Sequence, residues 1–469
     1  MKFEANPVIF TGKDLKKLIF PLIVEQLLGI SVGMFDTMMI SSLGDAAVSG
    51  VALVDMLNVL MINIFAALGT GGAVICAHEI GRVKATTPDG VGRDYKNARS
   101  AAKQLLVVLL VASGAVAILA YLARVQLLRL CFGAIEADVM AHALTYFVIS
   151  CISYPFIALY NGFAALFRTM GDSDVTMVSS VIVNVLNIIG NALLIYVFDQ
   201  GVAGAAWSST ISRAVGMFVL LVLITNKKRD IYIDFLERFR LEPGTIRKIL
   251  GIGIPGCFEN SVFQLGRILV ISMIAGFGTA QVAANAVANN LDALGCIPGQ
   301  ALSLAMITVI GQCIGAGDYD AANLYRKKLM KYGHLSMAAL NIAIILTLPL
   351  TLKLYNLTEE ALTLAAQLII LHDGLAIFLW PPSFIQPNAL RAAQDVRYTM
   401  IVSIFSMVAF RIFFTWVIGV QMGLGIMGVW IAMVFDWIFR SVMFCWRIHS
   451  GRWLSKLPAV SKSERDNDG

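Results

Sequence analysis

Two stretches of the sequence, PLIVEQLLGISVGMFDTMMISSLG at residues 21–44 and PGCFENSVFQLGRILVISMIAGFG at residues 255–278, indicate the fold. Each begins with a proline, carries a glutamate four residues later and ends with a glycine. Most residues between these points are apolar, and an apolar stretch of about 20 residues is long enough to cross a bilayer as a helix. The two stretches therefore predict two membrane helices that are copies of one another.

The rest of the chain has the same apolar character. Of its 469 residues, 58% are hydrophobic and only 14% are charged, and the mean hydropathy is +0.77. Soluble domains carry about 25% charged residues, so most of this surface is expected to face lipid. Apolar stretches separated by polar loops predict an all-α integral membrane protein with twelve transmembrane helices, at residues 15–40, 46–80, 100–123, 138–168, 176–199, 202–225, 246–276, 280–315, 329–353, 361–388, 399–420 and 424–448.

The basic residues are distributed unevenly over the predicted loops. If both chain ends are placed in the cytoplasm, 29 of the 36 Lys and Arg residues fall in cytoplasmic segments, and only Arg124, Arg129 and Lys353 fall in outer loops. Cytoplasmic loops of membrane proteins are enriched in Lys and Arg. The pattern predicts a multi-pass protein of the cell (plasma or inner) membrane with both termini in the cytoplasm. It also explains the net charge of +6 without a nucleic-acid partner.

The chain contains an internal repeat of six helices. Pairs of identical residues keep a register of 234 residues through the first two helices of each half, and a register of 223 or 224 after the polar loop at 83–93. The repeat predicts two pseudo-symmetric six-helix bundles, at 1–225 and 246–469, joined by a cytoplasmic linker at 226–245. Two similar bundles that face each other are typical of secondary transporters. The pairs are Pro21/Pro255, Glu25/Glu259, Gly44/Gly278, Gly81/Gly315, Asp94/Asp318, Arg168/Arg391, Asp172/Asp395 and Gly204/Gly428.

A set of short motifs also runs in a fixed order along nearly the whole chain. They are Pro21-x-x-x-Glu25-Gln26, GMFDTMMI at 33–40, Asn161-Gly162, RTMGD at 168–172, GVAGAA at 201–206, GFGTA at 276–280, AANAV at 283–287, Trp380-Pro381 and LRAA at 390–393. In order and spacing these motifs resemble the multidrug and toxic compound extrusion (MATE) family. The resemblance implies a twelve-helix fold of two bundles. It also implies export of small organic, often cationic, compounds by antiport with Na⁺ or H⁺.

Asp36 is a carboxylate inside a predicted apolar helix, fifteen residues after Pro21. Ionisable residues in a membrane span are costly and mark functional sites, and Asp36 resembles the acid of the family's first helix in type and in its spacing from the proline. It is therefore expected to bind the coupling cation and to exchange it for substrate. The alternative is a carboxylate near the outer end of the helix that is wetted or caps a neighbour, because Gly44 follows eight residues later.

The resemblance implies that polar residues of two later helices of the first half complete this cation site. The corresponding positions are Asn187, Asn191 and Ser209, and many family members have a second aspartate where Asn191 stands. With Asp36 as the sole acid, one monovalent cation is expected. Oxygen ligands suit Na⁺, and a buried acid can equally carry a proton. The alternative role of the two asparagines is hydrogen bonding between helices.

Glu25 and Glu259 are repeat equivalents that follow the prolines Pro21 and Pro255, which are expected to kink their helices. Each glutamate is a candidate for the path of substrate or cation, and a structural role beside the proline is an equal alternative. The sodium-driven branch of the family uses acids in the seventh and tenth helices. Glu259 lies four residues before the first of these positions, which Phe263 occupies, so this part of the resemblance is incomplete.

His372 and Asp373 are a candidate proton relay, because histidine titrates near neutral pH. Adjacent residues point to different faces of a helix, which argues against direct contact between the two. Arg411 is expected to form a structural ion pair with a buried acid, either Asp373 or Asp292. The remaining candidates for the substrate or cation path are Asp55, Asn58, Asn161 and Asp292, the last of which is the repeat equivalent of Asn58.

Other function classes fit the sequence less well. His78-Glu79 begins like a zinc-protease motif, but Arg82 stands where a second histidine is required, so an embedded enzyme is disfavoured. The seven cysteines form no CxxC pair that would suggest a zinc site. A flippase for lipid-linked oligosaccharides, from the same superfamily, is the closer alternative. Acids in the cleft favour cationic cargo instead. The prediction is a monomeric secondary transporter for small organic substrates that needs no cofactor beyond its coupling ion.

Overall fold

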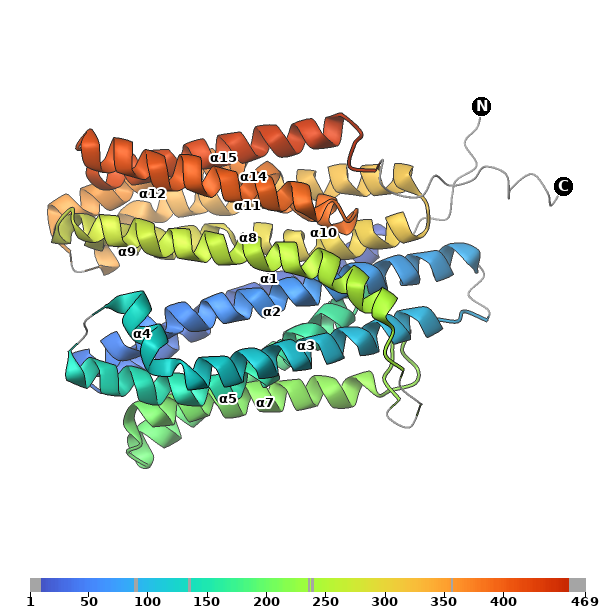
Figure 1. Ribbon diagram of the computed structural model, residues 1–469. Coiled ribbons are helices and arrows are strands. Elements are labelled where there is room, and N and C mark those ends of the chain that lie inside the picture. Colours follow the sequence, from blue (N-terminus) through green and yellow to red (C-terminus); the bar gives the residue numbers. More distant parts are fainter. Residues whose placement is uncertain are drawn as a thin grey trace.

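The computed structural model describes residues 10–87, 92–133, 136–234, 237, 240–355 and 357–454. Within these residues all regular structure is helical (Figure 1). Twelve of the described helices, some continued by a π or 3-10 segment, are long and apolar enough to cross a membrane, which confirms the predicted count. The α-helices are α1 Gly12–Ser41, α2 Asp45–Thr86, α3 Lys96–Leu122, α4 Arg124–Phe132, α5 Ala137–Met170, α6 Ser173–Asn191, α7 Gly201–Ile224, α8 Pro243–Ala275, α9 Thr279–Gly295, α10 Ile297–Gly315, α11 Tyr319–Thr351, α12 Glu359–Trp380, α13 Gln386–Ala392, α14 Val396–Ser406 and α15 Gly425–His449. The π or 3-10 segments are η1 Ala192–Val197, η2 Leu352–Leu354, η3 Pro381–Ile385, η4 Met407–Ile412 and η5 Thr415–Gln421.

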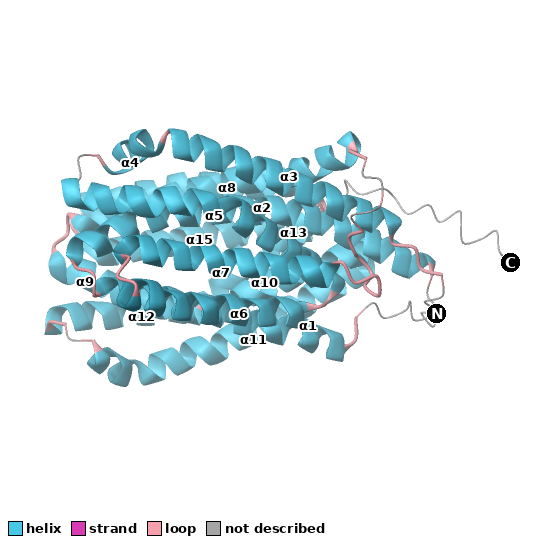
Figure 2. Cartoon of the chain, turned by 90° about the horizontal axis from the view of Figure 1, so that it is seen from below, coloured by secondary structure: helices cyan, strands magenta, loops and turns pink. Residues whose placement is uncertain are grey.

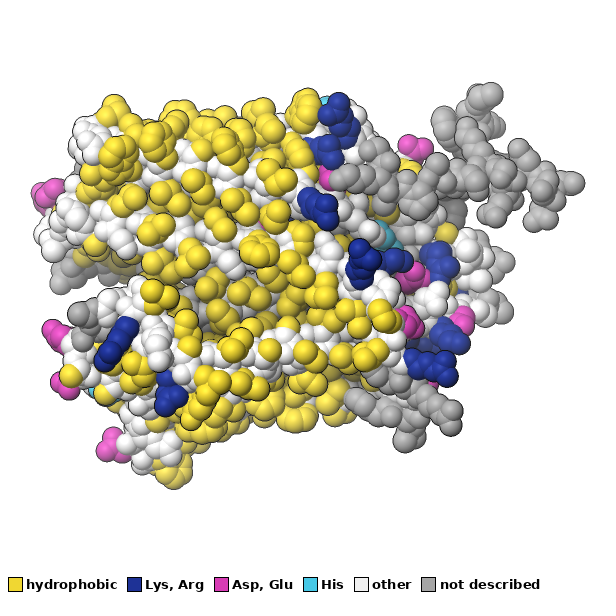
Figure 3. Space-filling model, viewed as in Figure 1, with side chains coloured by type: hydrophobic (Ala, Val, Ile, Leu, Met, Phe, Trp, Pro, Cys, Tyr) yellow, Lys and Arg dark blue, Asp and Glu magenta, His cyan; other side chains and the backbone are white. Residues whose placement is uncertain are grey.

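The long helices run side by side along one axis, and the loops lie at the two ends of the bundle (Figures 1 and 2). Hydrophobic side chains cover the middle of the visible surface, and most of the visible Lys and Arg side chains gather at one end (Figure 3). We call this end, where α1 begins and α15 ends, the basic end (Figure 1). An apolar band between two more polar ends is the surface expected of a protein that lies across a bilayer.

The single helix predicted at 280–315 is divided in the structure. α9 ends at Gly295 and α10 begins at Ile297, with Cys296 between them and Pro298 in the first turn of α10. Proline has no N–H to donate and disfavours helical geometry at the residue before it, which ends one helix and suits the start of the next. The prediction of one uninterrupted helix was therefore wrong, although the segment still occupies the place of one span.

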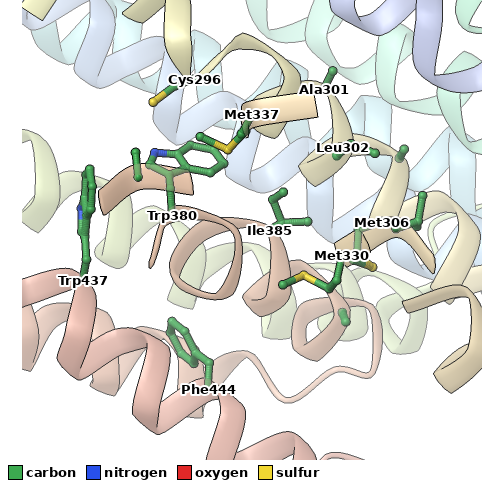
Figure 4. Packing of buried hydrophobic residues seen from close by; sticks show 14 of the residues in the cluster. Cys296, Ala301, Leu302, Met306, Met330, Met337, Trp380, Ile385, Trp437 and Phe444 are labelled. Atoms are coloured by element: carbon green, nitrogen blue, oxygen red, sulfur yellow. The ribbon is translucent and has the colours of Figure 1, made fainter. Parts of the chain in front are cut away.

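Each half has its own hydrophobic core. One cluster of buried residues comes mainly from α8 to α15, and the other comes mainly from α2 to α7. In the second half, side chains from three helices lie around Ile385: Met337 of α11, Trp380 of α12, and Trp437 and Phe444 of α15 (Figure 4). Large side chains that interlock in this way make each half a packed unit that can support a polar site.

The sequence repeat is also a repeat of backbone geometry. Gly44 precedes α2 and has φ +99°, and its equivalent Gly278 precedes α9 and has φ +97°. Only glycine adopts this region without strain, which explains why both copies keep it. Pro21 lies inside α1 and Pro255 lies inside α8, at matching places. The two halves thus start with the same helix–turn–helix.

The two halves contact each other through α2 and α10 near the basic end. A Cβ atom at Gly81 would lie 1.9 Å from the carbonyl oxygen of Gln312, and a Cβ atom at Gly315 would lie 2.0 Å from the carbonyl oxygen of His78. Gly81 and Gly315 are repeat equivalents, and so are His78 and Gln312. The two backbones therefore cross on the pseudo-twofold axis, at a point that only glycine permits.

Candidate functional site

The predicted cation site is assembled in the first half, in the part of the bundle away from the basic end. Asn191 Nδ2 of α6 donates to Asp36 Oδ1 of α1 at 2.6 Å. Asn187 Nδ2, one turn earlier on α6, donates to Ser209 Oγ of α7 at 3.1 Å. Both asparagines are buried, and Asp36 is half-buried. The structure thus brings together the four residues that the resemblance implied.

Two amide oxygens of this site, Oδ1 of Asn187 and Oδ1 of Asn191, have no hydrogen-bond donor among the described residues. Leaving a buried polar atom unpaired costs about 1–3 kcal/mol, and a bound cation can satisfy both oxygens. With the Asp36 carboxylate and Ser209 Oγ they are all oxygen atoms, the type of ligand that hard cations prefer. A carboxylate in this position can also take up a proton.

Asp55 and Asn58 of α2 extend the site toward α5. Asn58 Nδ2 lies 3.3 Å from Asp55 Oδ1 and donates to Ser150 Oγ at 3.2 Å. The hydroxyl of Tyr154 donates to Asn58 Oδ1 at 3.1 Å. Every polar atom of the buried Asn58 amide is therefore engaged, and Asn58 holds Asp55 in place. Ser150 and Tyr154 were not among the residues predicted for this site.

Arg213 of α7 is a member of the site that sequence reasoning missed. Its guanidinium donates to Ser153 Oγ at 3.0 Å and interacts electrostatically with both Asp36 and Asp55. The sequence analysis expected Asp36 to be the sole acid of the site. The structure adds Asp55 as a second acid. With both acids ionised, two carboxylates and one guanidinium leave a net charge of −1. The available signal was spacing, because Arg213 follows Ser209 by one helical turn and shares its face.

Glu25 and Glu259 occupy equivalent ion pairs in the two halves. Arg168 donates to Glu25 Oε1 at 3.2 Å, and Arg391 donates to Glu259 Oε1 at 2.7 Å. Thr176 Oγ1 adds a hydrogen bond to Glu25 Oε2 at 2.7 Å. Because Arg168 and Arg391 are themselves repeat equivalents, the same ion pair fastens the first helix of each half to the segment that ends its fourth span. This geometry supports the structural role of the two glutamates.

Asn161 lies apart from the Asp36 site. Together with Arg168 and Thr308 it lines a small cavity of about 70 Å³ between the two halves. Its Nδ2 has no partner among the described residues. A role for Asn161 in the substrate path stays a prediction.

His372 of α12 bridges two carboxylates in the second half. Its Nδ1 lies 2.8 Å from Asp373 Oδ1, and its Nε2 lies 3.1 Å from Asp292 Oδ1 of α9. The ring packs edge-on against Trp430 and Trp437, with centroids 5.0 Å and 4.7 Å away. The expectation that adjacent residues cannot meet was wrong. Both side chains reach from the helix into the same gap, which the two tryptophans close.

Arg411 makes no ion pair within 4.0 Å with any carboxylate of the described residues, contrary to the expectation from sequence. The carboxylates that act electrostatically on the Arg411 guanidinium are those of Asp436 and Asp292. Asp292 lies against His372, and Asp436 accepts a hydrogen bond from Ser406. Arg411 lies in the π segment η4, which changes the face on which a residue falls. Its side chain lines a cavity in the second half instead.

Comparison with known proteins agrees with this architecture. The MatE family model matches residues 21–193 and residues 255–417, once in each half. The two matches begin at Pro21 and Pro255, in the register of the internal repeat. The boundaries of the two bundles and of the linker between them stay a prediction.

Relatives and solved structures match over nearly the full chain. The chain is 27% identical to the uncharacterized transporter YisQ of Bacillus subtilis, over 94% of this chain and 95% of that protein. It is 25% identical to the probable multidrug resistance protein NorM of Thermotoga maritima, over 97% and 95%. Its fold is similar to that of a multidrug resistance MATE family transporter in an outward-facing conformation, with a TM-score of 0.85 and 21% identity over 95% of this chain and 96% of that one. Since the family model matches most of the chain, this protein belongs to the MatE family, the multidrug and toxic compound extrusion transporters.

Proposed function

We propose that this protein exports small organic compounds from the cell by antiport with Na⁺ or H⁺. The observation that supports the proposal is the site at Asp36, where a carboxylate and two donor-free amide oxygens meet inside a membrane span. Polar and charged groups in a span are retained where they bind something. The name of the Thermotoga relative, a probable multidrug resistance protein, agrees with export of organic compounds.

The charge of the site gives a mechanism for coupling. When Asp36, Asp55 and Arg213 are all ionised, one negative charge is unbalanced in the membrane, and a bound Na⁺ or a proton neutralises it. Neutralisation removes the energetic cost of closing the apolar surroundings over the site. The two halves can then rock about the crossing of α2 and α10, as related bundles do in alternating access. The cation and the substrate are thereby bound in different conformations of the two halves.

Na⁺ and H⁺ would use different atoms of the site. A metal cation uses the amide oxygens of Asn187 and Asn191 together with Asp36, whereas a proton needs a carboxylate alone. The decisive experiment uses the full chain in proteoliposomes. These are loaded either with tetramethylrhodamine methyl ester or with tetramethylrhodamine, the same dye with a free carboxylate in place of the ester. Efflux is followed under a Na⁺ gradient alone and then under a proton gradient alone, with ionophores that collapse each gradient as controls. Transport driven by neither gradient would overturn the antiport proposal.

We also propose that the basic end faces the cytoplasm, with both termini inside and the chain acting as a monomer in the cell membrane. The distribution of Lys and Arg supports this orientation. Both bundles of the fold are present in one chain, which supports the monomer. A green fluorescent protein fused to the C-terminus is expected to fluoresce, and alkaline phosphatase fused at the same point is expected to be inactive. The opposite pattern would overturn the orientation.

A further inference from the structure

The second half contains a polar cavity of about 300 Å³ away from the basic end. Its walls come from α8, α9, η4 and α15. Two arginines line it, Arg267 of α8 and Arg411 of η4, together with Asn285 and Asn289 of α9 and Trp430 of α15. The cavity is thus polar and lined by two basic side chains, although three of its four walls belong to membrane spans.

This cavity occupies the repeat-equivalent place of the cation site. Val270, which lines it, stands 234 residues after Asp36, and Asn289 stands 234 residues after Asp55. With the later register of 223 or 224, Asn187 corresponds to Phe410 or Arg411. Each carboxylate of the first-half site is therefore replaced by an uncharged residue, and a guanidinium lies at or beside the place of an amide. The place is the same and the charge is reversed.

The two arginines are available to a ligand. No carboxylate of the described residues lies within 4.0 Å of either guanidinium, and Arg411 Nε is buried without an acceptor. Asp436 and Asp292 act on Arg411 electrostatically from a longer distance, and each also has a partner of its own, Ser406 and His372. A guanidinium with no hydrogen-bonded counter-ion inside a membrane span is costly, and an anion would lower that cost.

Hydrogen bonds fix the uncharged side chains that line the cavity beside the arginines. Trp430 Nε1 donates to Asn285 Oδ1 at 3.1 Å, which fixes the indole against α9. Asn289 Nδ2 donates to the carbonyl oxygen of Asn285 at 2.7 Å. An indole that lines the same cavity as the arginines offers an aromatic surface to the ring of a ligand whose acidic group is held by arginine.

We propose that this cavity binds the acidic group of the exported molecule, so that the cargo includes aromatic carboxylates and zwitterions. The inference rests on the proposed export function, whose substrate class it names. Arginine binds a carboxylate through two parallel hydrogen bonds, which gives both affinity and orientation. The expectation that acids in the cleft favour cationic cargo rested on Asp36 and Glu25, and Glu25 is ion-paired with Arg168.

The test compares two dyes that differ only in this group, tetramethylrhodamine with a free carboxylate and its methyl ester. Binding to the full chain in phosphatidylcholine nanodiscs is measured by fluorescence anisotropy without any ion gradient. The wild type is expected to bind the carboxylate about tenfold more tightly than the ester. Arg411→Gln and Arg267→Gln are each expected to weaken carboxylate binding about tenfold and to leave ester binding unchanged. Arg411→Lys is expected to restore part of the preference.

Arg129→Gln is the matched control, because Arg129 lies on α4 of the other half, and it should keep the preference of the wild type. Equal binding of the two dyes by the wild type, or equal loss of both in the Arg411 variant, would overturn the proposal. A second set of nanodiscs contains phosphatidylglycerol. If this lipid abolishes carboxylate binding, the cavity holds a lipid phosphate and the cargo assignment is overturned. Gradient-driven efflux of the ester by a protein without carboxylate preference would leave the export function standing and remove only this inference.

Discussion

The two halves of this protein share a backbone and carry opposite charge at the equivalent place. The first half places Asp36 and Asp55 beside one arginine, and the second half places Arg267 and Arg411 around Val270. What the halves keep in common lies elsewhere, in the ion pairs of the two glutamates and in the glycine crossing.

This difference distinguishes residues that both halves keep from residues that only one half has. Residues that brace a half or let the halves approach are present in both copies, because both halves need the same packing. Residues that meet a ligand differ between the copies, because a transporter for two different partners needs two different sites. On the two proposals above, the first half binds the cation and the second half binds the acidic group of the cargo, and each variant below is chosen to break or sharpen this comparison.

The largest effect is expected from Asp36→Asn, which removes the carboxylate of the cation site and keeps its shape. Gradient-driven efflux from proteoliposomes is expected to fall more than about 100-fold, since interactions with a charged group contribute up to about 3 kcal/mol. Asp138→Asn, an exposed carboxylate in the first turn of α5, is the matched control and should transport normally. Efflux by Asp36→Asn at the wild-type rate would show that the charge asymmetry has no role in coupling.

The next effect concerns stability and compares the two glutamates. Glu259→Gln is expected to lower the free energy of unfolding by about 3–5 kcal/mol, because it leaves Arg391 and the nearby Arg440 without their buried counter-charge. Glu25→Gln is expected to cost less, about 1–3 kcal/mol, since its side chain is 11% exposed and keeps a hydroxyl partner.

The glutamate comparison is measured by thermal unfolding of the purified protein followed by intrinsic fluorescence. Glu79→Gln removes a more exposed pair with Arg82 and should cost no more than about 0.5 kcal/mol. If the two buried variants unfold like Glu79→Gln, the ion pairs do not brace the halves, and a role in the transport path becomes the better interpretation.

A smaller effect is expected at the glycine crossing. Gly81→Ala and Gly315→Ala each insert a methyl group against a backbone carbonyl of the other half and should destabilise the protein by about 1–3 kcal/mol. The two variants should cost the same, because the crossing is symmetric. Gly114→Ala is the control, since its added methyl group meets open space on α3 and should be neutral or slightly stabilising. Unequal losses at the two positions would contradict the twofold contact.

The smallest effect is expected at Asp230, in the segment that connects the halves. Burial raises the pKa of the Asp230 carboxyl above its ordinary value, although Lys84 and Arg93 act in the opposite direction. An acid whose pKa is raised by folding loses its contribution to stability as the pH rises through that pKa. Asp230→Asn should therefore be more stable than the wild type at neutral pH, by about 0.5 kcal/mol, and the difference should vanish at acidic pH. Thermal unfolding over a pH series measures it, and a loss of stability at neutral pH would contradict the prediction.

The spans were predictable because a bilayer imposes a length on every apolar stretch. The division at Cys296 was not, because proline has no single meaning in a helix. Pro21, Pro155 and Pro349 lie inside continuous helices, whereas Pro298 opens a new one. Neighbouring helices decide which outcome holds, since they supply or withhold partners for the freed backbone groups.

The candidate site was predictable where a residue type and a motif agreed, as at Asp36 and Asn191. It was not predictable where helix rotation decides the partner. Arg213 reaches two acids, and His372 meets its own neighbour, because of how whole helices turn against one another. Arg411 adds a further obstacle, since a π segment shifts every later residue relative to the 3.6-residue period on which such reasoning depends.

At the crossing of α2 and α10, Gly81 meets Gln312 and Gly315 meets His78, so the same two positions contact each other reciprocally, which is the geometry of an isologous interface between identical subunits. In a homodimer, one substitution at such a point strikes both sides of the contact at once. In this fused chain, each side can change separately, so one half is free to become acidic and the other basic while the shared axis is preserved. Joining the two copies in one polypeptide is thus what allowed a symmetric frame to hold two unlike sites.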